Sequence, residues 1–535
     1  MSQSQSTETY DVIIVGFGAA GAAAAIEAAD NGAKVLVLDR AYGGGASALS
    51  GGVIYAGGGT EQQKAAGYQD TVDNLYAYLK KEVDDAVDDA TLRDFCEQSP
   101  GIIPWLEAQG ATFASGVAPY KTSYPTDDYY LYFSGNEKAF PYNLDTVPAP
   151  RGHRVVAKRL ASGKVMMARL MESALRKGVN FVPLARVTDL IVTDDRVTGV
   201  KYRVLDAADP RAVKHRRLTK ATAKIGNFSP GAVDKIVKKA DRLWEEGAVE
   251  RVASAPNVIL AAGGFAYNKE WLQEHAPEFI GISPLGTPAD DGAGIELGTN
   301  VGATTSHMNK VTAWRFLSPP SAFIEGVTVG LNGRRIKNED LYGATHGNVL
   351  VREFGAKGWA VFDSVSWRKA TRQVLSQTQI FQKLQVAFIL SPLGHVKAAT
   401  LDELARKMGV DSAGLRETVS TYNEGIASGA GDPAHKDPEL CTPVLKAPYR
   451  AFNISDDSSP FLPLPGLTLG GLVVKGDSGL VTRDDGTVIK GLYAAGRNAV
   501  GVCSNSYVSG LSVADCLFSG RRAGAHAAKA KSSAR

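Results

Sequence analysis

The chain has 535 residues, of which 44% are hydrophobic and 21% charged, which is ordinary for a folded protein of at least two domains. Its 59 basic and 56 acidic residues nearly balance, so we expect neither a nucleic-acid partner nor a charged membrane surface. No apolar run reaches the length of a membrane span, and four cysteines without a CxxC pair suggest neither a disulfide framework nor a zinc site. Because no basic and apolar leader precedes Tyr10, we expect a soluble, cytoplasmic protein.

Residues 10–40 form the most regular unit in the sequence. Val12–Val15 predicts a short buried strand, Ala19–Asn31 an alanine-rich helix, and Val35–Leu38 a second strand. The turn between the first strand and the helix is glycine-rich, as required where the backbone bends sharply or approaches a ligand. This order predicts a βαβ unit.

The turn has the sequence Gly16-Phe17-Gly18-Ala19-Ala20-Gly21. The first glycine permits the tight turn, the second lets a pyrophosphate approach the backbone, and the third allows helix and strand to pack closely. Asp39 ends the second strand, where an acid meets the ribose hydroxyls of a dinucleotide. We therefore predict a Rossmann-type dinucleotide site that includes Gly16, Gly18, Ala19, Ala20, Gly21, Asp39 and Arg40.

The middle of the chain alternates between regular and irregular segments. Residues 41–60 read as a glycine- and serine-rich loop, 70–110 as helical, and 114–150 as an irregular stretch rich in tyrosine and proline. Further on we predict, in order, a helix at Arg154–Lys177, a strand at Asn180–Leu184, a hairpin at Arg186–Val204 turning at Asp194-Asp195, and a polar insertion at 205–256. Within the insertion, the spacing of Val233, Ile236, Val237, Ala240 and Leu243 predicts an amphipathic surface helix, with partner docking as an alternative.

The residue pattern changes twice in the second half of the chain. Asn257–Phe265 predicts a buried strand that ends in glycines, whereas residues 307–446 contain strands, a long helical region and a helix pair at Leu401–Ala427. Residues 447–535 return to glycine-rich strand, turn and helix patterns. We therefore predict an α/β protein with a discontinuous dinucleotide domain, residues 1–306 and 447–535, and an inserted α+β catalytic domain, residues 307–446.

Two late segments distinguish FAD from NAD. Ala261-Ala262-Gly263-Gly264-Phe265 and Gly491–Arg497 each follow a buried strand, and both resemble flavoprotein signatures. With the βαβ unit, they make the chain resemble the fumarate reductase/3-ketosteroid dehydrogenase flavoprotein superfamily over nearly its whole length. The resemblance implies a Rossmann-like FAD domain, a smaller catalytic domain and an active site between them. It also implies cofactor contacts from Ser47, Ser50, Gly51, Gly52, Ala261, Gly263, Asp291, Gly496, Arg497 and Ser512.

The sequence departs from this superfamily where its members bind a flavin covalently or hold dicarboxylates. No histidine precedes Gly51-Gly52, so we expect noncovalent FAD. Leu469 stands where fumarate enzymes have a histidine, and Tyr507-Val508-Ser509-Gly510 stands where they have an arginine motif. A diacid needs cations to be buried, so these replacements favour a large apolar ketone. The Tyr-x-Ser arrangement resembles the 3-ketosteroid Δ4-(5α)-dehydrogenases more than the Δ1-dehydrogenases.

This resemblance implies removal of a C4 proton and a C5 hydride from a saturated 3-oxosteroid, with flavin N5 receiving the hydride. Tyr507 is the candidate donor to the C3 oxygen, with a backbone amide near Gly510 or Gly471. Tyr342 is the candidate acceptor of the C4 proton, and Ser509 is placed to join a relay, although the two tyrosines could exchange roles. A Δ1-dehydrogenase, a fumarate- or urocanate-type reductase and a flavin-binding sensor stay as alternatives. The sequence identifies neither a metal site nor the electron acceptor.

Overall fold

A ten-stranded sheet unites the first and last parts of the chain in the computed structural model, which describes residues 8–225 and 230–530. Its centre consists of mutually parallel strands: β22 (Val488–Ala494), β11 (Asn257–Leu260), β2 (Val12–Val15), β3 (Val35–Asp39) and β7 (Asn180–Pro183). Strands β2, β3 and β11 are buried throughout, as expected for a parallel sheet covered on both faces. The α/β class and the predicted central strands are confirmed.

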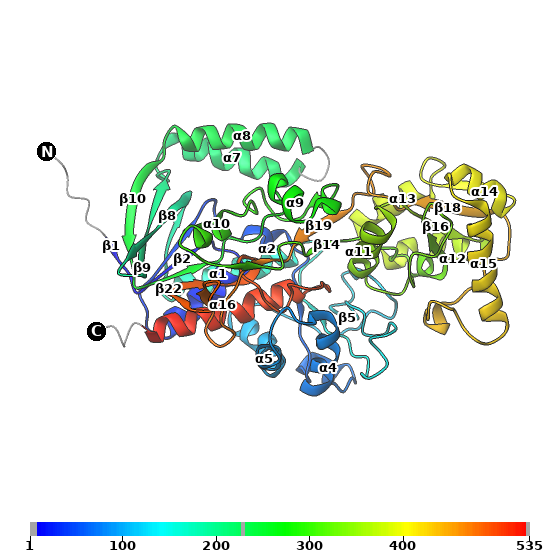
Figure 1. The fold of residues 1–535 in the computed structure, drawn as a ribbon, viewed down its shortest axis with the longest axis horizontal. Helices are drawn as coiled ribbons and strands as arrows, with labels where there is room; N and C mark the ends of the chain where they lie inside the picture. Colours follow the sequence, from blue (N-terminus) through cyan, green and yellow to red (C-terminus); the bar gives the residue numbers. More distant parts are fainter. Residues whose placement is uncertain (1–7, 226–229, 531–535) are drawn as a thin grey trace.

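The two ends of the chain meet where helices α1 (Ala19–Asp30) and α16 (Leu511–Ala530) pack side by side (Figure 1). A side chain at Gly520 or Gly524 would overlap the backbone of Ala20 or Ala24 on α1. Glycine at these positions therefore permits unusually close helix packing. The contact brings the C-terminal helix beside the N-terminal glycine turn.

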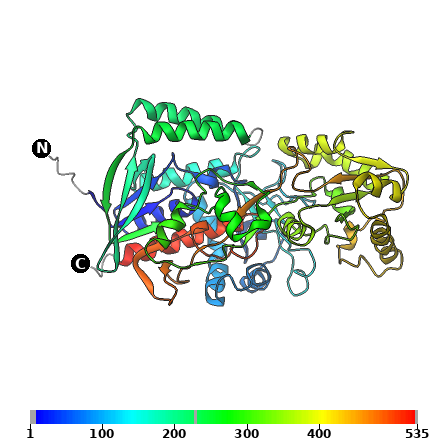
Figure 2. The same ribbon diagram turned by 45° about the horizontal axis from the view of Figure 1, so that its top comes forward.

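An antiparallel extension continues the sheet on one side. Strands β8 (Ala185–Thr193), β9 (Arg196–Val204) and β10 (Val249–Ser254) form it, and β1 (Glu8–Thr9) adds to its edge. Asp194 and Asp195 have positive φ, which confirms the predicted hairpin turn. Helices α7 (Pro210–Ile225) and α8 (Pro230–Glu245) form a hairpin above this extension (Figures 1 and 2). The predicted surface helix is thus present, although the side chain of Val233 lies outside the described part.

A further layer of helices and short strands packs against α1 and α16. They include α4 (Val72–Val83), α5 (Asp89–Ala108), α6 (Ser162–Arg176), β4 (Val53–Tyr55), β5 (Leu131–Tyr132) and β6 (Gly152–Arg154). The predicted start of a helix at Arg154 is wrong, because Arg154 ends β6 and pairs with Val53 on β4. Its buried guanidinium donates hydrogen bonds to Ser162 Oγ and to Asp127 Oδ1. These contacts fix residue 154 in extended backbone, and the helix begins only at Ser162.

The second domain, at the right of Figure 1, has its own antiparallel sheet in the order β15-β16-β18-β17. The strands are β15 (Val327–Val329), β16 (Trp359–Phe362), β18 (Tyr449–Asn453) and β17 (Val396–Ala398). Its helices are α11 (Gly343–Phe354), α12 (Ser364–Gln377), α13 (Ile380–Leu390), α14 (Leu401–Met408) and α15 (Ser412–Ala427). The last two confirm the predicted helix pair. Strand β18 lies beyond residue 446, and the predicted domain boundaries stay predictions.

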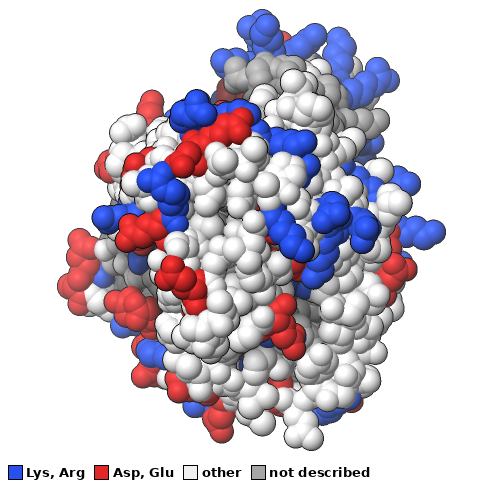
Figure 3. Space-filling view, turned by 90° about the vertical axis from the view of Figure 1, so that its right-hand side faces the viewer, with Lys and Arg blue, Asp and Glu red and all other residues white. Residues whose placement is uncertain are grey.

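Short elements join the two domains. Strands β14 (Val311–Ala313) and β19 (Pro465–Thr468) pair antiparallel, so the outgoing and returning chains lie together. Seen from the second domain, basic and acidic side chains lie around a broad uncharged centre (Figure 3). Among residues 8–225 and 230–530, no helix combines the length and apolarity needed to cross a bilayer.

Candidate active site

The glycine turn between β2 and α1 lies at the carboxyl edge of the parallel sheet. Gly16 has φ of 102°, and a side chain there would overlap the carbonyl of Ala261. Gly21 packs equally closely on the Gly16 backbone. Gly18, the N-cap of α1, is more open, because the nearest atom to a Cβ there would be Ser47 Oγ at 3.6 Å. Gly16 and Gly21 are thus required by packing, whereas Gly18 leaves backbone accessible to a ligand.

Asp39 and Arg40 lie at the end of β3, beside this turn. Asp39 Oδ2 accepts a hydrogen bond from Phe17 N at 2.8 Å, and Oδ1 accepts one from Ala41 N at 2.8 Å. The carboxylate therefore holds the glycine turn against the strand end. Arg40 Nη1 pairs with Asp291 Oδ2 at 2.6 Å, so two predicted cofactor residues from distant segments are in contact.

Ser47, Ser50, Gly51 and Gly52 belong to the loop that contains α2 (Gly45–Leu49). Ser47 Oγ accepts a hydrogen bond from Ala19 N at 3.1 Å, which ties the loop to the start of α1. Ser50 Oγ donates to Ser47 O at 2.7 Å and accepts from Gly52 N at 3.2 Å. The predicted loop residues thus stabilise one another beside the glycine turn.

The remaining predicted cofactor residues come from the ends of β11 and β22 and from α16. Ala261 follows β11, and its amide donates to Val15 O at 2.8 Å. Gly496, with φ of 62°, packs on Ala20 of α1, and Ser512 lies buried in the first turn of α16. All these elements end or begin at one edge of the parallel sheet, where ligands of such sheets bind.

Asp290 and Arg497 form a buried ion pair at this edge. Arg497 Nη2 lies 2.5 Å from Asp290 Oδ1, and a side chain at Gly263, where φ is 90°, would meet the same carboxylate. Arg497 Nη1 and Asn498 Nδ2 are both buried donors without a hydrogen-bond partner. Two unused buried donors beside an uncapped helix N-terminus fit a large polar, anionic ligand.

Tyr342, Tyr507 and Ser509 lie together where the two domains meet. The Tyr507 ring is 5.1 Å from the Trp314 ring and 6.3 Å from the Tyr342 ring, measured between centroids. Ser509 Oγ lies 3.1 Å from the hydroxyl of Tyr132. Tertiary folding therefore brings the three predicted catalytic residues together and adds Tyr132. Our sequence reasoning missed Tyr132, although its tyrosine-rich segment, Tyr120–Glu137, was a usable signal.

The tyrosines of this cluster are buried, and burial controls the acid–base behaviour of their hydroxyl groups. Burial raises the pKa of Tyr342 well above its usual value, against a lowering hydrogen bond with Ser509. Burial also raises the pKa of Tyr507, against a lowering hydrogen bond with the Gly510 backbone, and it raises that of Tyr132. At neutral pH these side chains are therefore neutral hydroxyls that can donate hydrogen bonds.

The two predicted backbone donors, Gly510 and Gly471, lie in different surroundings. Gly510, with φ of 92°, adjoins the Tyr507 hydroxyl, and its carbonyl accepts a hydrogen bond from Tyr55 N at 3.1 Å. Gly471 lies in β20 (Gly471–Leu472), packed on the backbone of Asn498. Leu469 is buried in the same apolar cluster as both tyrosines. Of the two glycines, Gly510 therefore lies at the tyrosine cluster, and its role as a donor stays a prediction.

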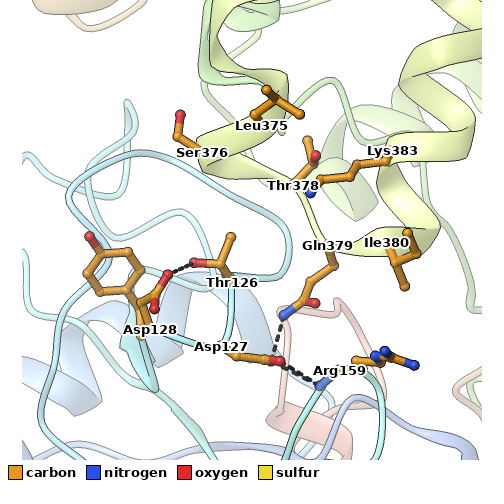
Figure 4. Close-up of a pocket in the computed structure, with 11 residues that line it drawn as sticks. Thr126, Asp127, Asp128, Arg159, Leu375, Ser376, Thr378, Gln379, Ile380 and Lys383 are labelled. Carbon is orange, nitrogen blue, oxygen red and sulfur yellow. Dashed lines mark hydrogen bonds between the residues drawn. The ribbon is translucent and has the colours of Figure 1, made fainter.

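A cleft of about 530 Å³ lies nearby, at the seam between the domains (Figure 4). The loop carrying Asp127 forms one wall, and the end of α12 with the start of α13 forms the other. Gln379 Nε2 crosses the seam and donates to Asp127 Oδ1 at 2.8 Å. Tyr129, in the cleft wall, belongs to the same apolar cluster as Tyr132. One apolar cluster therefore reaches from the cleft wall to Tyr132, the partner of Ser509.

Comparison with known proteins identifies the family of this chain. The family model described as "FAD binding domain" matches residues 11–513. The chain belongs to this flavoprotein family. It is 38% identical to a 3-oxo-5-alpha-steroid 4-dehydrogenase of Comamonas testosteroni, over 92% of this chain and 93% of that one. It is 26% identical to a probable fumarate reductase of Shewanella frigidimarina, over 98% of this chain and 75% of that protein.

Solved structures agree with these relatives. A 3-ketosteroid-Δ4-(5α)-dehydrogenase of Rhodococcus jostii RHA1, in complex with 4-androstene-3,17-dione, superposes with a TM-score of 0.82 at 31% identity. The match covers 97% of each chain. The predicted superfamily and its cofactor, FAD, are thereby confirmed, while the individual site residues stay predictions.

The residues present fit FAD. The accessible backbone at Gly18 and the uncapped start of α1 suit the pyrophosphate, and the unpaired Arg497 and Asn498 donors suit polar atoms of the same cofactor. Within the described ranges, no group of three His, Cys, Asp or Glu side chains is arranged to hold a metal ion.

Proposed function

We propose that this flavoprotein is a 3-ketosteroid Δ4-dehydrogenase, which introduces a C4–C5 double bond into a 3-oxosteroid with a saturated A ring. The observation that carries the proposal is the neutral hydroxyl cluster of Tyr342, Tyr507 and Ser509 at the domain junction. Tyr507 stacks on Trp314, and both tyrosines belong to an apolar core cluster that also contains Leu469, an environment that accepts an apolar ketone but penalises a dicarboxylate. The relatives named for Δ4-dehydrogenation of 3-oxosteroids support the same substrate and bond.

Tyr507 serves in this proposal as the hydrogen-bond donor to the C3 carbonyl. Its raised pKa keeps the hydroxyl protonated, and the Gly510 backbone adjoins it. A donor aimed at a carbonyl oxygen stabilises the negative charge that develops when the C4 proton leaves. The carbonyl thereby makes the C4 proton acidic enough for a weak base to take it.

Tyr342 receives the C4 proton in this proposal. Because its pKa is also raised, a free tyrosinate is costly, and a concerted relay is favoured. The Tyr342 oxygen takes the C4 proton while its own proton passes to Ser509, Ser509 passes its proton to the Tyr132 hydroxyl beside it, and Tyr132 releases one proton to solvent, so each hydroxyl ends neutral. Bound FAD supplies the acceptor for the C5 hydride. Ser509, which lowers the pKa of Tyr342, favours Tyr342 over Tyr507 for the relay in this proposal.

The seam cleft would hold the end of the steroid distant from the A ring. Its polar lining, including Gln379 and Arg159, suits an oxygen substituent, and its Tyr129 packs on the apolar cluster that contains Tyr132. The electron acceptor that reoxidises the flavin stays unassigned. The four cysteines are unpaired, which supports our placement of the protein in the cytoplasm.

The decisive experiment is anaerobic mixing of the purified yellow protein with 5α- and 5β-3-oxosteroids. We expect the flavin absorbance band to bleach and the product to be a 4-ene-3-one, identified by mass spectrometry and NMR. A 1-ene-3-one product would instead assign the Δ1 activity. Reoxidation by fumarate without any response to steroids would assign a carboxylate reductase, and binding without bleaching would indicate a sensor.

A further inference from the structure

Glu82, on α4, is a fully buried carboxylate that lies outside the tyrosine cluster. Its Oε1 accepts hydrogen bonds from the Tyr78 hydroxyl at 3.0 Å and from Asn136 Nδ2 at 2.7 Å. Its Oε2 accepts one from Ser506 Oγ at 2.8 Å. Burial raises the pKa of Glu82, and the hydrogen bonds from Asn136, Ser506 and Tyr78 offset only part of that rise. Three donors aimed at one carboxyl group indicate that it acts as an acceptor.

One arm of this network leads to Tyr507. Ser506, whose hydroxyl binds Oε2, directly precedes Tyr507 in the chain. Asn505 Nδ2 also donates to the backbone oxygen of Glu82 at 2.9 Å. Two consecutive residues of the loop that carries Tyr507 are therefore fastened to one residue of α4.

The other arm leads to Tyr342. Asn136 donates from Nδ2 to Glu82 and accepts at Oδ1 from the backbone amide of Tyr342 at 2.6 Å. The same Nδ2 donates to Thr345 Oγ1 at 3.0 Å, so Asn136 also holds the first turn of α11. Because Nδ2 of Asn136 donates and Oδ1 accepts, Glu82 and the Tyr342 amide together fix the orientation of the Asn136 side chain.

Glu82 is thus the shared anchor of two tyrosines that come from different domains. The Tyr342 and Tyr507 rings contact each other only by packing, with centroids 6.3 Å apart and planes inclined by 39°. Packing alone tolerates small shifts, whereas short hydrogen bonds to a carboxylate define direction as well as distance. A displacement of about 1 Å at a reacting group can cost about 100-fold in rate.

We propose that Glu82 is a positioning residue that holds Tyr342 and Tyr507 in their reactive arrangement across the domain junction. This inference rests on the proposed Δ4-dehydrogenase function. It assigns Glu82 no contact with substrate or cofactor. It requires that loss of the anchor slows the chemical step while leaving steroid and FAD binding largely intact.

The test compares Glu82→Ala, Glu82→Gln and Ser506→Ala with the wild-type holoenzyme. Ser504→Ala is the matched control, since Ser504 is buried in the same loop but donates to Leu469 O at 2.7 Å. For Glu82→Ala we expect kcat to fall about 100-fold, with KM and FAD content changed less than about twofold. The deuterium isotope effect with C4-deuterated steroid should rise, because proton abstraction becomes more strongly rate-limiting.

Glu82→Gln keeps an acceptor for the first arm, so we expect partial rescue relative to Glu82→Ala. The double variant Glu82→Ala/Ser506→Ala should be no slower than Glu82→Ala alone, because both changes break one network. If Glu82→Ala fails to fold, Glu82→Gln and Ser506→Ala still test the inference through kcat and the isotope effect.

Three results would overturn it: an unchanged kcat in the Glu82 variants, a rise in KM alone, or an equal loss in Ser504→Ala. If the wild type converts 3-oxosteroids and any of these three results is obtained, only this inference is overturned. A wild type that converts no 3-oxosteroid overturns the proposed function and this inference together.

Discussion

The Tyr507 hydroxyl offers the sharpest test of the proposed chemistry. In Tyr507→Phe the ring can keep its stacking on Trp314, because only one oxygen atom is removed. The removed oxygen adjoins only the Gly510 backbone, so stability should change by no more than about 1 kcal/mol. A single donor to a developing oxyanion is worth about 3 kcal/mol, which corresponds to a loss of roughly 100- to 200-fold in kcat.

The assay is single-turnover bleaching of the flavin by a 5α-3-oxosteroid under anaerobic conditions. Tyr493→Phe is the matched control, since Tyr493 lies on strand β22 and its hydroxyl hydrogen-bonds Nδ1 of His526 on α16 at 3.0 Å. Exchange of the C4 proton with D₂O provides a second readout, which Tyr342→Phe should abolish and Tyr507→Phe should only slow. Retention of kcat within threefold in Tyr507→Phe would refute its role as carbonyl donor.

Three further predictions concern the cofactor turn and two buried groups. Gly16→Ala should prevent accumulation of folded protein, because the backbone of residue 16 has φ of 102°. Gly18→Ala should fold but bind FAD at least about tenfold more weakly, as measured by flavin content and titration. Burial lowers the pKa of both His153 and His346 from 6.5 to about 4. The unfolded state therefore binds more protons between these values, and the share of the stability that depends on His153 should fall by about 2 kcal/mol from pH 7 to pH 5. His153→Gln should flatten that dependence in urea unfolding. Asp70→Asn should cost about 3–5 kcal/mol in the same assay, because it leaves the buried Arg151 guanidinium, now 2.9 Å from Asp70, without a counter-charge.

Locally encoded features were predictable from the sequence. The βαβ unit and the hairpin turn at Asp194-Asp195 follow from residue spacing and turn chemistry over a few positions. The helix expected from Arg154 begins only at Ser162, since a distant carboxylate and the partner strand β4 hold Arg154 in extended backbone. Local pattern fails there because the deciding contacts come from elsewhere in the chain.

The sequence by itself determined the FAD-binding class, because glycine and strand patterns at both ends of the chain encode a cofactor cradle locally. It also marked Tyr342, Tyr507 and Ser509 through their resemblance to a flavoprotein branch. Only the tertiary structure decided that these side chains meet, that Tyr132 joins Ser509, and that Glu82 connects both tyrosine segments. These contacts join residues from 54 to 424 positions apart, and they form only when burial removes water and leaves each polar group to find a partner within the protein.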